Sequence, residues 1–243
     1  MVFKLEESMS IHNWKETPED FFEAEHSSQK NILHPLTAEI INKLKPKTLL
    51  DYGCGDGRLL ELLNRGIEIS VFDRSPEMLR HIKVKRGGLL KQIYSSTTEL
   101  PIEHFDVALL SMVLMCIDDK AEYANVCNNV SRAIKENGRV IISLSHPCFR
   151  QYRFSNFHTS FGEKQLFDYL NDGNPFNVTI HDKGPDEITF EDYHYSLSFT
   201  INQLSKAGLV IESIIETTDD LKHSRSNSLY SPYIILICKH NEK

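Results

Sequence analysis

The sequence of 243 residues predicts an α/β fold in which helices cover both faces of a mostly parallel sheet. From residue 46 onward, short apolar segments alternate with segments of helical periodicity, as in sheets built from crossover units. The segment FDVALLS at 105–111 is apolar almost throughout, which is typical of a strand buried on both faces. Hydrophobic residues make up 40% and charged residues 25%, a composition that favours a folded chain over disorder.

The elements before the sheet are predicted to be helical. Residues 1–26 are polar, contain Trp14, and are expected to form a loop and a short helix after Pro18. Apolar residues recur at helical spacing over 28–44, so an amphipathic helix is expected there, ending at Pro46.

Cap and turn residues mark the helices of the following segment. Ser75 and Pro76 are typical of an N-cap and a first helical residue. Asp119 and Glu122 resemble a capping box, and the helix that they start is expected to run to about Lys135, with Asn137 and Gly138 as its stop signal. Expected helices cover 58–64, 75–85, 119–135 and 197–207, and expected strands cover 48–52, 68–73, 92–94, 105–111, 139–143, 209–215 and 233–239.

Residues 144–195 interrupt this alternation. They are rich in His, Tyr, Phe, Asn and Gly and show no clear period. A long irregular stretch inside a compact chain is usually an active-site lid or a binding insertion, and that is what we expect here.

Charge and cysteine usage restrict the class of protein. The formal net charge is -7, which repels phosphate backbones and argues against a nucleic-acid partner. The N-terminal segment lacks the apolar stretch of a signal peptide, and the longest apolar run near the C-terminus is too short to cross a bilayer. Five scattered cysteines without a C-x-x-C pair indicate reduced thiols and no metal site. We therefore expect a cytoplasmic protein without a membrane partner.

The segment LLDYGCGDGR at 49–58 is the most informative motif. It follows a strand and opens a helix, where Gly53 and Gly55 permit a tight turn and close approach of a ligand to the backbone. Asp73 ends the next strand about 20 residues later, where a carboxylate can accept both hydroxyls of an adenosine ribose.

Charge discriminates between two nucleoside ligands for this turn. A dinucleotide fingerprint places its third glycine where this chain has Arg58, and Asp51 and Asp56 would repel a pyrophosphate. The same acids attract the ammonium and sulfonium of S-adenosylmethionine. The sequence therefore favours S-adenosylmethionine over a nicotinamide dinucleotide.

These residues resemble the first motif of class I S-adenosylmethionine-dependent methyltransferases. The resemblance covers about residues 30–240, with VFDRSPEML (71–79), TTELP (97–101), FDVALLSMVLMCIDD (105–119) and GRVIISLSHPCF (138–149) following in order. It is strongest to the small-molecule branch, in which a strand ending in His-Pro precedes an insertion and a Tyr-His segment such as Tyr193-His194. The resemblance implies a Rossmann-like sheet of seven strands with the last strand antiparallel, and S-adenosylmethionine as methyl donor.

The resemblance also implies roles for residues. Asp51 and the backbone around Gly53 would hold the methionine part, Asp73 the ribose, and Arg74 and Met78 the adenine. The family's usual Asp for the adenine amino group is replaced by Ser96, so the side chain of Ser96 or the backbone of Thr97 would take its place. The expected donor-binding residues are Asp51, Gly53, Cys54, Gly55, Asp73, Arg74, Met78, Ser96, Thr97, Ser111 and Met112.

The chemistry is expected to be a direct displacement in which the protein aligns nucleophile, methyl carbon and sulfur. A base is needed only if the accepting atom must lose a proton. His146 and, second, His194 are the candidates, and each could instead be a hydrogen-bonded structural histidine. Aromatic walls for a flat acceptor could come from Trp14, Tyr152, Tyr193 and Tyr195.

The leading hypothesis is a methyltransferase that acts on O, N or C of a small molecule. The alternatives are an RNA or protein methyltransferase and a non-catalytic S-adenosylmethionine-binding protein. The expected organisation is one domain, 1–243, with N-terminal cap helices in 1–45, a donor-binding core in 46–143, a lid or substrate insertion in 144–195 and C-terminal core elements in 196–243.

Overall fold

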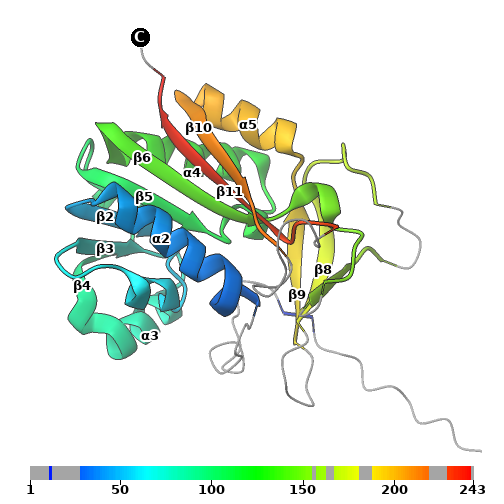
Figure 1. Cartoon of the computed structure of the whole chain (residues 1–243), viewed down its shortest axis with the longest axis horizontal. Coiled ribbons are helices and arrows are strands. Elements are labelled where there is room, and N and C mark those ends of the chain that lie inside the picture. The colour runs from blue at the N-terminus through cyan, green and yellow to red at the C-terminus, as the bar shows by residue number, and fades with distance from the viewer. Residues whose placement is uncertain are drawn as a thin grey trace, which may run out of the picture.

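The computed structural model describes residues 11–12, 28–154, 157–162, 167–180, 188–218 and 229–241. Within them the chain forms a sheet of seven strands and a sheet of four (Figure 1). The expected helix after Pro18 and the candidate aromatic residue Trp14 lie outside the described residues.

The main sheet contains β2 (Thr48–Tyr52), β3 (Glu68–Phe72), β4 (Leu90–Tyr94), β5 (Phe105–Ser111), β6 (Ile134–Ser145), β10 (Leu209–Glu216) and β11 (Tyr233–His240). Their order in space is β10-β11-β6-β5-β2-β3-β4. β11 runs antiparallel to both of its neighbours, and the other pairs are parallel. The predicted α/β fold, with seven strands and an antiparallel last strand, is confirmed.

Helices cover both faces of the main sheet, and Figure 1 shows α2 (His34–Leu44) in front of it and α4 (Lys120–Ala133) behind. α2 and α3 (Pro76–Arg86) contribute to one apolar cluster, and α4 and α5 (Leu197–Lys206) contribute to the other. Leu49 belongs to the first cluster and Leu50 to the second, because successive side chains of a strand point to opposite faces. Both leucines are fully buried, which explains the unbroken apolar runs of the central strands.

Two of the expected helix starts are confirmed by their caps. Ser75 Oγ accepts a hydrogen bond from the Met78 N–H at 3.3 Å, and Asp119 Oδ1 accepts one from the Glu122 N–H at 2.7 Å. The end expected for α4, at about Lys135, lies two residues too late. The helix ends at Ala133 because the next residue, Ile134, already pairs with Phe105 in the sheet. The expected helix at 58–64 is a short 3-10 helix, Arg58–Leu62.

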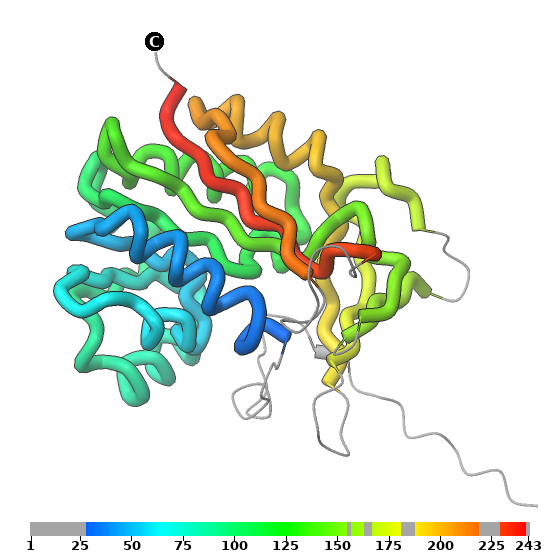
Figure 2. The backbone as a smooth tube through the Cα atoms, in the orientation of Figure 1, coloured from blue at the N-terminus to red at the C-terminus, as the bar shows by residue number. Residues whose placement is uncertain are grey.

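The segment expected to be irregular, 144–195, forms most of the second sheet. Its strands are β7 (Phe157–Ser160), β8 (Asn174–Ile180) and β9 (Ile188–His194), and β1 (Ile11–His12) pairs with β9. The space order is β1-β9-β8-β7. Figure 2 shows the yellow β9 segment to one side of the main sheet. β9 contacts the short helix Leu114–Cys116, which follows the carboxyl end of β5.

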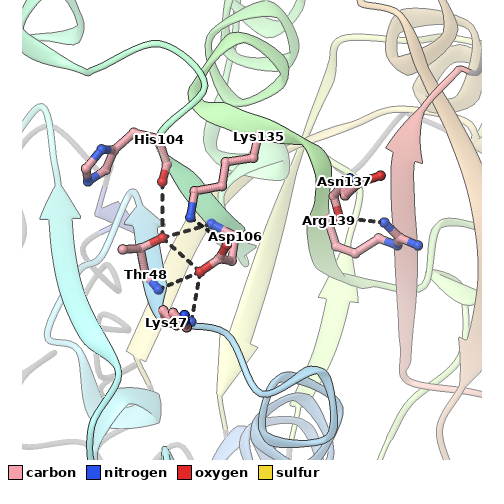
Figure 3. A network of polar contacts seen from close by, with 7 residues as sticks. All are labelled: Lys47, Thr48, His104, Asp106, Lys135, Asn137 and Arg139. Atoms are coloured by element: carbon pink, nitrogen blue, oxygen red, sulfur yellow. Dashed lines mark hydrogen bonds and ion pairs between the residues drawn. The ribbon is translucent and has the colours of Figure 1, made fainter.

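A polar network ties the chain together at the amino ends of the central strands. Asp106 accepts hydrogen bonds from the backbone N–H groups of Lys47 and Thr48 at 2.8 and 2.9 Å, and from Lys135 Nζ at 2.7 Å (Figure 3). Burial alone would raise the pKa of Asp106, but these donors outweigh burial and lower the pKa to about 2. Every oxygen of this carboxylate therefore has a partner within the protein.

Candidate active site

A cavity of the described residues lies at the opposite edge, where β2, β3 and β5 end. Its volume is about 430 Å³, within the usual range for sites that hold a small ligand. Ligands of open α/β sheets bind at the carboxyl ends of the strands, beside the point where the strand order reverses. Here the strand order reverses between β2 and β5, which are neighbours in the sheet.

The glycine-rich turn after β2 forms one wall of the cavity. Gly53 has a φ of 75° and its N–H donates to the Phe72 carbonyl at 2.7 Å. A Cβ on Gly53 would come within 2.7 Å of Val113 Cγ2, so the turn has no room for a side chain at this position. A Cβ on Gly55, whose φ is 51°, would meet nothing within 4 Å. The Gly55 backbone is thus exposed to the cavity, as close approach of a ligand requires.

Two buried carboxylates face this turn. Asp51 and Asp73 are 3% and 9% exposed. Burial, together with the nearby carboxylates of Asp73 and Asp56, raises the pKa of Asp51 to about 7. Among the residues that the structure describes, neither Asp51 nor Asp73 forms an ion pair. The wall therefore carries two buried carboxylates. The positive charge of Arg74 acts on Asp73 but forms no ion pair with it, and this arrangement favours a cationic ligand.

Asp73 also holds the turn in place. One carboxylate oxygen accepts the Gly55 N–H at 3.0 Å and the other accepts the Ser75 N–H at 2.9 Å. Burial raises the pKa of Asp73, and these two donors partly offset the rise. A carboxylate oxygen has more than one lone-pair direction, so Asp73 can still accept hydrogen bonds from a ligand.

Most of the expected donor-binding residues line this cavity. Asp51, Gly53, Cys54, Gly55, Asp73, Arg74, Met78, Thr97, Ser111 and Met112 all do so. Ser96 does not: its Oγ accepts the Thr98 N–H at 3.3 Å and caps a short helix. Arg74 reaches the cavity but is held by Glu122, with 2.8 Å between Arg74 Nη1 and Glu122 Oε1.

Sequence reasoning missed one wall of the cavity, which comes from α4. Glu122, Asn125 and Asn129 line it at helical spacing, and Asn129 Nδ2 donates to the Tyr52 hydroxyl at 3.2 Å. Polar residues three and four apart share a helix face. That pattern, on a helix starting beyond the carboxyl end of β5, was a signal that could have identified them. Gln29 and His34 near the start of the N-terminal helix line the cavity as well.

Met112 occupies an unusual position after β5. Its φ of 59° is in the left-handed region, which is rare for residues other than glycine. Its N–H donates to the Ser143 carbonyl at 2.9 Å, and its own carbonyl accepts from Cys116 Sγ at 3.2 Å. Strained backbone of this kind is common at functional sites, where surrounding contacts maintain it.

A second, smaller cavity of about 40 Å³ adjoins the first, with Met112 and Gln29 lining both. Its remaining walls come mainly from the second sheet and from the ends of the main-sheet strands. They are formed by Ser28, Ser145, Phe157, Thr159, Val178, Ile180, Asp192 and Tyr233. Residues of the segment expected to form a lid thus line a cavity that adjoins the larger one.

The two candidate bases line neither cavity. The Nε2 of His146 is 2.9 Å from Glu216 Oε1, and its Nδ1 accepts the Cys148 N–H at 3.2 Å. His194 Nδ1 accepts from Arg150 Nε at 3.1 Å, and its Nε2 lies 2.9 Å from the Tyr169 carbonyl. Burial lowers the pKa of both histidines. Both ring nitrogens of each are hydrogen-bonded within the protein, so this geometry supports structural roles and not the expected catalytic ones.

The expected aromatic walls are also absent from the two cavities. Tyr152, Tyr193 and Tyr195 do not line them, and Tyr195 donates instead to the Ile117 carbonyl at 2.8 Å inside the core. In the described part of the chain, no group of three or more His, Cys, Asp or Glu side chains could hold a metal ion. No helix there is long and apolar enough to cross a membrane.

Comparisons with known proteins agree with this site. Residues 50–142 match the model of a family described as a methyltransferase domain. An uncharacterized protein of Haemophilus influenzae is 26% identical over 201 residues, 76% of each chain. An uncharacterized methyltransferase of Schizosaccharomyces pombe is 28% identical over 133 residues, 51% of each chain. An S-adenosylmethionine-dependent methyltransferase from Clostridium acetobutylicum shares the fold, with a TM-score of 0.60 and 19% identity over 86% of this chain and 92% of that one.

Proposed function

The chain belongs to the class I S-adenosylmethionine-dependent methyltransferase family, and we propose that it transfers the methyl group to a small-molecule acceptor. The methyltransferase-domain match, together with the fold, supports this enzyme class, and S-adenosylmethionine as the methyl donor is part of the proposal. The acceptor and the residues that bind each substrate are our proposals. The donor supplies a methyl group on a sulfonium, which is already activated for displacement.

The donor would bind in the larger cavity. The Asp51 carboxylate would bind the ammonium of its methionine part, and the exposed backbone at Gly55 allows close approach. The remaining acceptor capacity of Asp73 suits the ribose hydroxyls, as its place at the end of β3 predicts. Unpaired carboxylates beside a cavity of about 430 Å³ therefore fit a cationic nucleoside.

The adjoining small cavity is the observation that supports a small-molecule acceptor. It has a volume of about 40 Å³ and shares Met112 and Gln29 with the larger cavity. A site of this size encloses a group of a few atoms, not an extended polymer surface. The formal net charge of -7 also disfavours a phosphate backbone as partner. We retain the proposal that the N-terminal helices and the 144–195 insertion close the site over the donor.

A two-stage experiment tests the proposal. Calorimetric titration with S-adenosylmethionine and S-adenosylhomocysteine should show saturable binding of both. Release of S-adenosylhomocysteine is then measured with a panel of metabolites and, separately, with bulk RNA and with a protein lysate. Turnover with metabolites supports the proposal, and turnover with RNA or protein alone overturns it. Donor binding without turnover on any acceptor would favour the non-catalytic alternative.

We also propose a cytoplasmic location. All five cysteines lie within the described residues and none forms a disulfide. Free thiols are typical of a reducing compartment. Fractionation of cells expressing the tagged chain, with detection in the soluble or the membrane fraction, tests this placement.

A further inference from the structure

One carboxylate on the second sheet lies between the two cavities. Asp192 of β9 is 5% exposed and lines the smaller cavity. Its Oδ1 is 3.9 Å from the Sγ of Cys116, and Cys116 lines the larger cavity. Asp192 therefore lies at the wall through which the two cavities adjoin, and Met112 lines both of them.

The surroundings of Asp192 in the smaller cavity are largely apolar. Phe157, Val178, Ile180 and Tyr233 supply most of that lining. Binding sites commonly combine apolar walls with a few polar groups that orient the ligand. In this cavity Asp192 is the one lining side chain that carries a full charge, within the described part of the chain.

Arg150 places a buried positive charge near this carboxylate. The guanidinium is 4% exposed and interacts electrostatically with Asp192. It is held in place by Arg150 Nε, which donates to His194 Nδ1 at 3.1 Å, and by Nη1, which donates to Ser145 Oγ at 2.8 Å. A fixed positive charge nearby stabilises a buried carboxylate. His194 is therefore linked to this site by its hydrogen bond with Arg150.

We propose that Asp192 binds the nucleophile of the acceptor and removes its proton, and that the acceptor is a small hydroxyl or amine compound. This inference rests on the proposed function. As the bond from the oxygen or nitrogen to the methyl carbon forms, the bond from that carbon to sulfur breaks and its electron pair stays on the sulfur. The proton of the hydroxyl or amine passes to the Asp192 carboxylate, so the sulfonium charge and the carboxylate charge disappear together.

The role is open to test with small probes of matched shape. Isobutylamine, isobutanol and isopentane are titrated against the full chain saturated with S-adenosylhomocysteine, with ligand-observed NMR as readout. We expect the amine or the alcohol to bind at least tenfold more tightly than isopentane, because only they donate a hydrogen bond to the carboxylate. Because isobutylamine is a cation at neutral pH and isobutanol is neutral, the difference between them measures how much the charge of the probe adds to the hydrogen bond.

Two variants of Asp192 assign the effect to this residue. Asp192→Asn should weaken binding of the preferred probe at least tenfold and leave binding of S-adenosylhomocysteine within twofold. Glu191→Gln is the matched control, because Glu191 is the neighbouring residue on β9 and lines neither cavity. Asp192→Glu keeps the charge beside Arg150 but lengthens the side chain, so it should also weaken probe binding in a cavity of about 40 Å³.

The outcomes separate this inference from the proposed function. If the wild-type chain does not bind S-adenosylhomocysteine, both are overturned. If it binds S-adenosylhomocysteine but prefers neither the amine nor the alcohol to isopentane, only the role of Asp192 falls. Probe binding unchanged in Asp192→Asn also overturns it. Should that variant fail to fold, as judged by circular dichroism, unchanged probe binding in Asp192→Glu decides against the inference and weakened binding supports it.

Discussion

Two carboxylates at opposite ends of the central strands behave in opposite ways. At the amino end, Asp106 is surrounded by donors from Lys47, Thr48 and Lys135, and its pKa falls to about 2. At the carboxyl end, burial and neighbouring acids raise the pKa of Asp51 to about 7. At the amino end, hydrogen-bond donors within the protein stabilise the charged carboxylate of Asp106. At the carboxyl end, burial and neighbouring acids destabilise the charged carboxylate of Asp51, which a cationic ligand would stabilise. Perturbed carboxylates of the second kind are typical of functional sites.

The two pKa shifts have opposite consequences for folding stability. The lowered pKa of Asp106 adds stability above its ordinary value near 3.9, and that stability is lost as pH falls toward 2. The raised pKa of Asp51 means that the fold prefers the protonated form, so stability declines as pH rises through about 7. A bound cation offsets that loss, which couples donor binding to stability.

The largest effect is expected from Asp73→Ala. The change removes the acceptor of the ribose hydroxyls and releases the N–H groups of Gly55 and Ser75. We expect S-adenosylmethionine binding to weaken by about 2–4 kcal/mol, the range for two charge-assisted hydrogen bonds. Calorimetry measures the change. An unchanged dissociation constant would remove Asp73 from the donor site.

The next largest effect is expected from Asp51→Asn, which should weaken donor binding but stabilise the unliganded protein. Asp51→Asn keeps the shape of the side chain but removes the charge that attracts the donor's ammonium. We expect donor binding to weaken by about 1.5–3 kcal/mol. The unliganded variant should melt at a higher temperature than the wild type at pH 8, because a buried unpaired charge is gone. Thermal melts with and without S-adenosylhomocysteine check both parts, and a lower melting temperature without ligand would contradict the second.

The pH dependence of donor binding follows from the same group. The pKa of Asp51 is about 7, so the carboxylate becomes protonated as the pH falls below that value. Its attraction for a cation weakens accordingly. Between pH 8 and pH 6 we expect the wild-type affinity for S-adenosylmethionine to fall by up to roughly tenfold, because the ionised fraction of a group with a pKa of about 7 falls about tenfold over this range. Asp51→Asn should show a flatter profile over that range. Equal slopes in the two proteins would assign the titration to another group.

Most of the residues expected to bind the donor line the larger cavity, whereas the residues expected at the acceptor that the structure describes line neither cavity. Asp51, Gly53 and Asp73 were found because a strand, a tight turn and a second strand impose their spacing, and that geometry is local. Asp192 was not found, because its position beside Cys116 depends on how β9 packs against the main sheet. Local signals contain no information about such long-range contacts.

The second sheet was missed for a related reason. In β9 the buried face carries Phe190, Asp192 and His194, so polar residues interrupt the apolar alternation that marks a half-buried strand. The end of α4 was misplaced because pairing of Ile134 with Phe105 overrides the stop signal at Gly138. His146 was assigned to the cleft from its place after β6, but its ring turns to Glu216 and to the backbone of Cys148.

The smallest effect is expected at the amino end. Asp106→Asn leaves one acceptor oxygen for several donors and places an amide NH₂ against the backbone N–H groups or the ammonium of Lys135. We expect the free energy of unfolding to fall by about 1–2 kcal/mol at pH 7, measured by urea denaturation. The difference from the wild type should shrink as the medium is acidified toward pH 2, where Asp106 itself becomes protonated.

Donor affinity of Asp106→Asn should stay within twofold of the wild type, since this network lies at the far end of the strands from the cavity. A loss of donor affinity as large as that of Asp51→Asn would mean that the two ends of the sheet are coupled, and that the division between a stabilising edge and a binding edge is wrong.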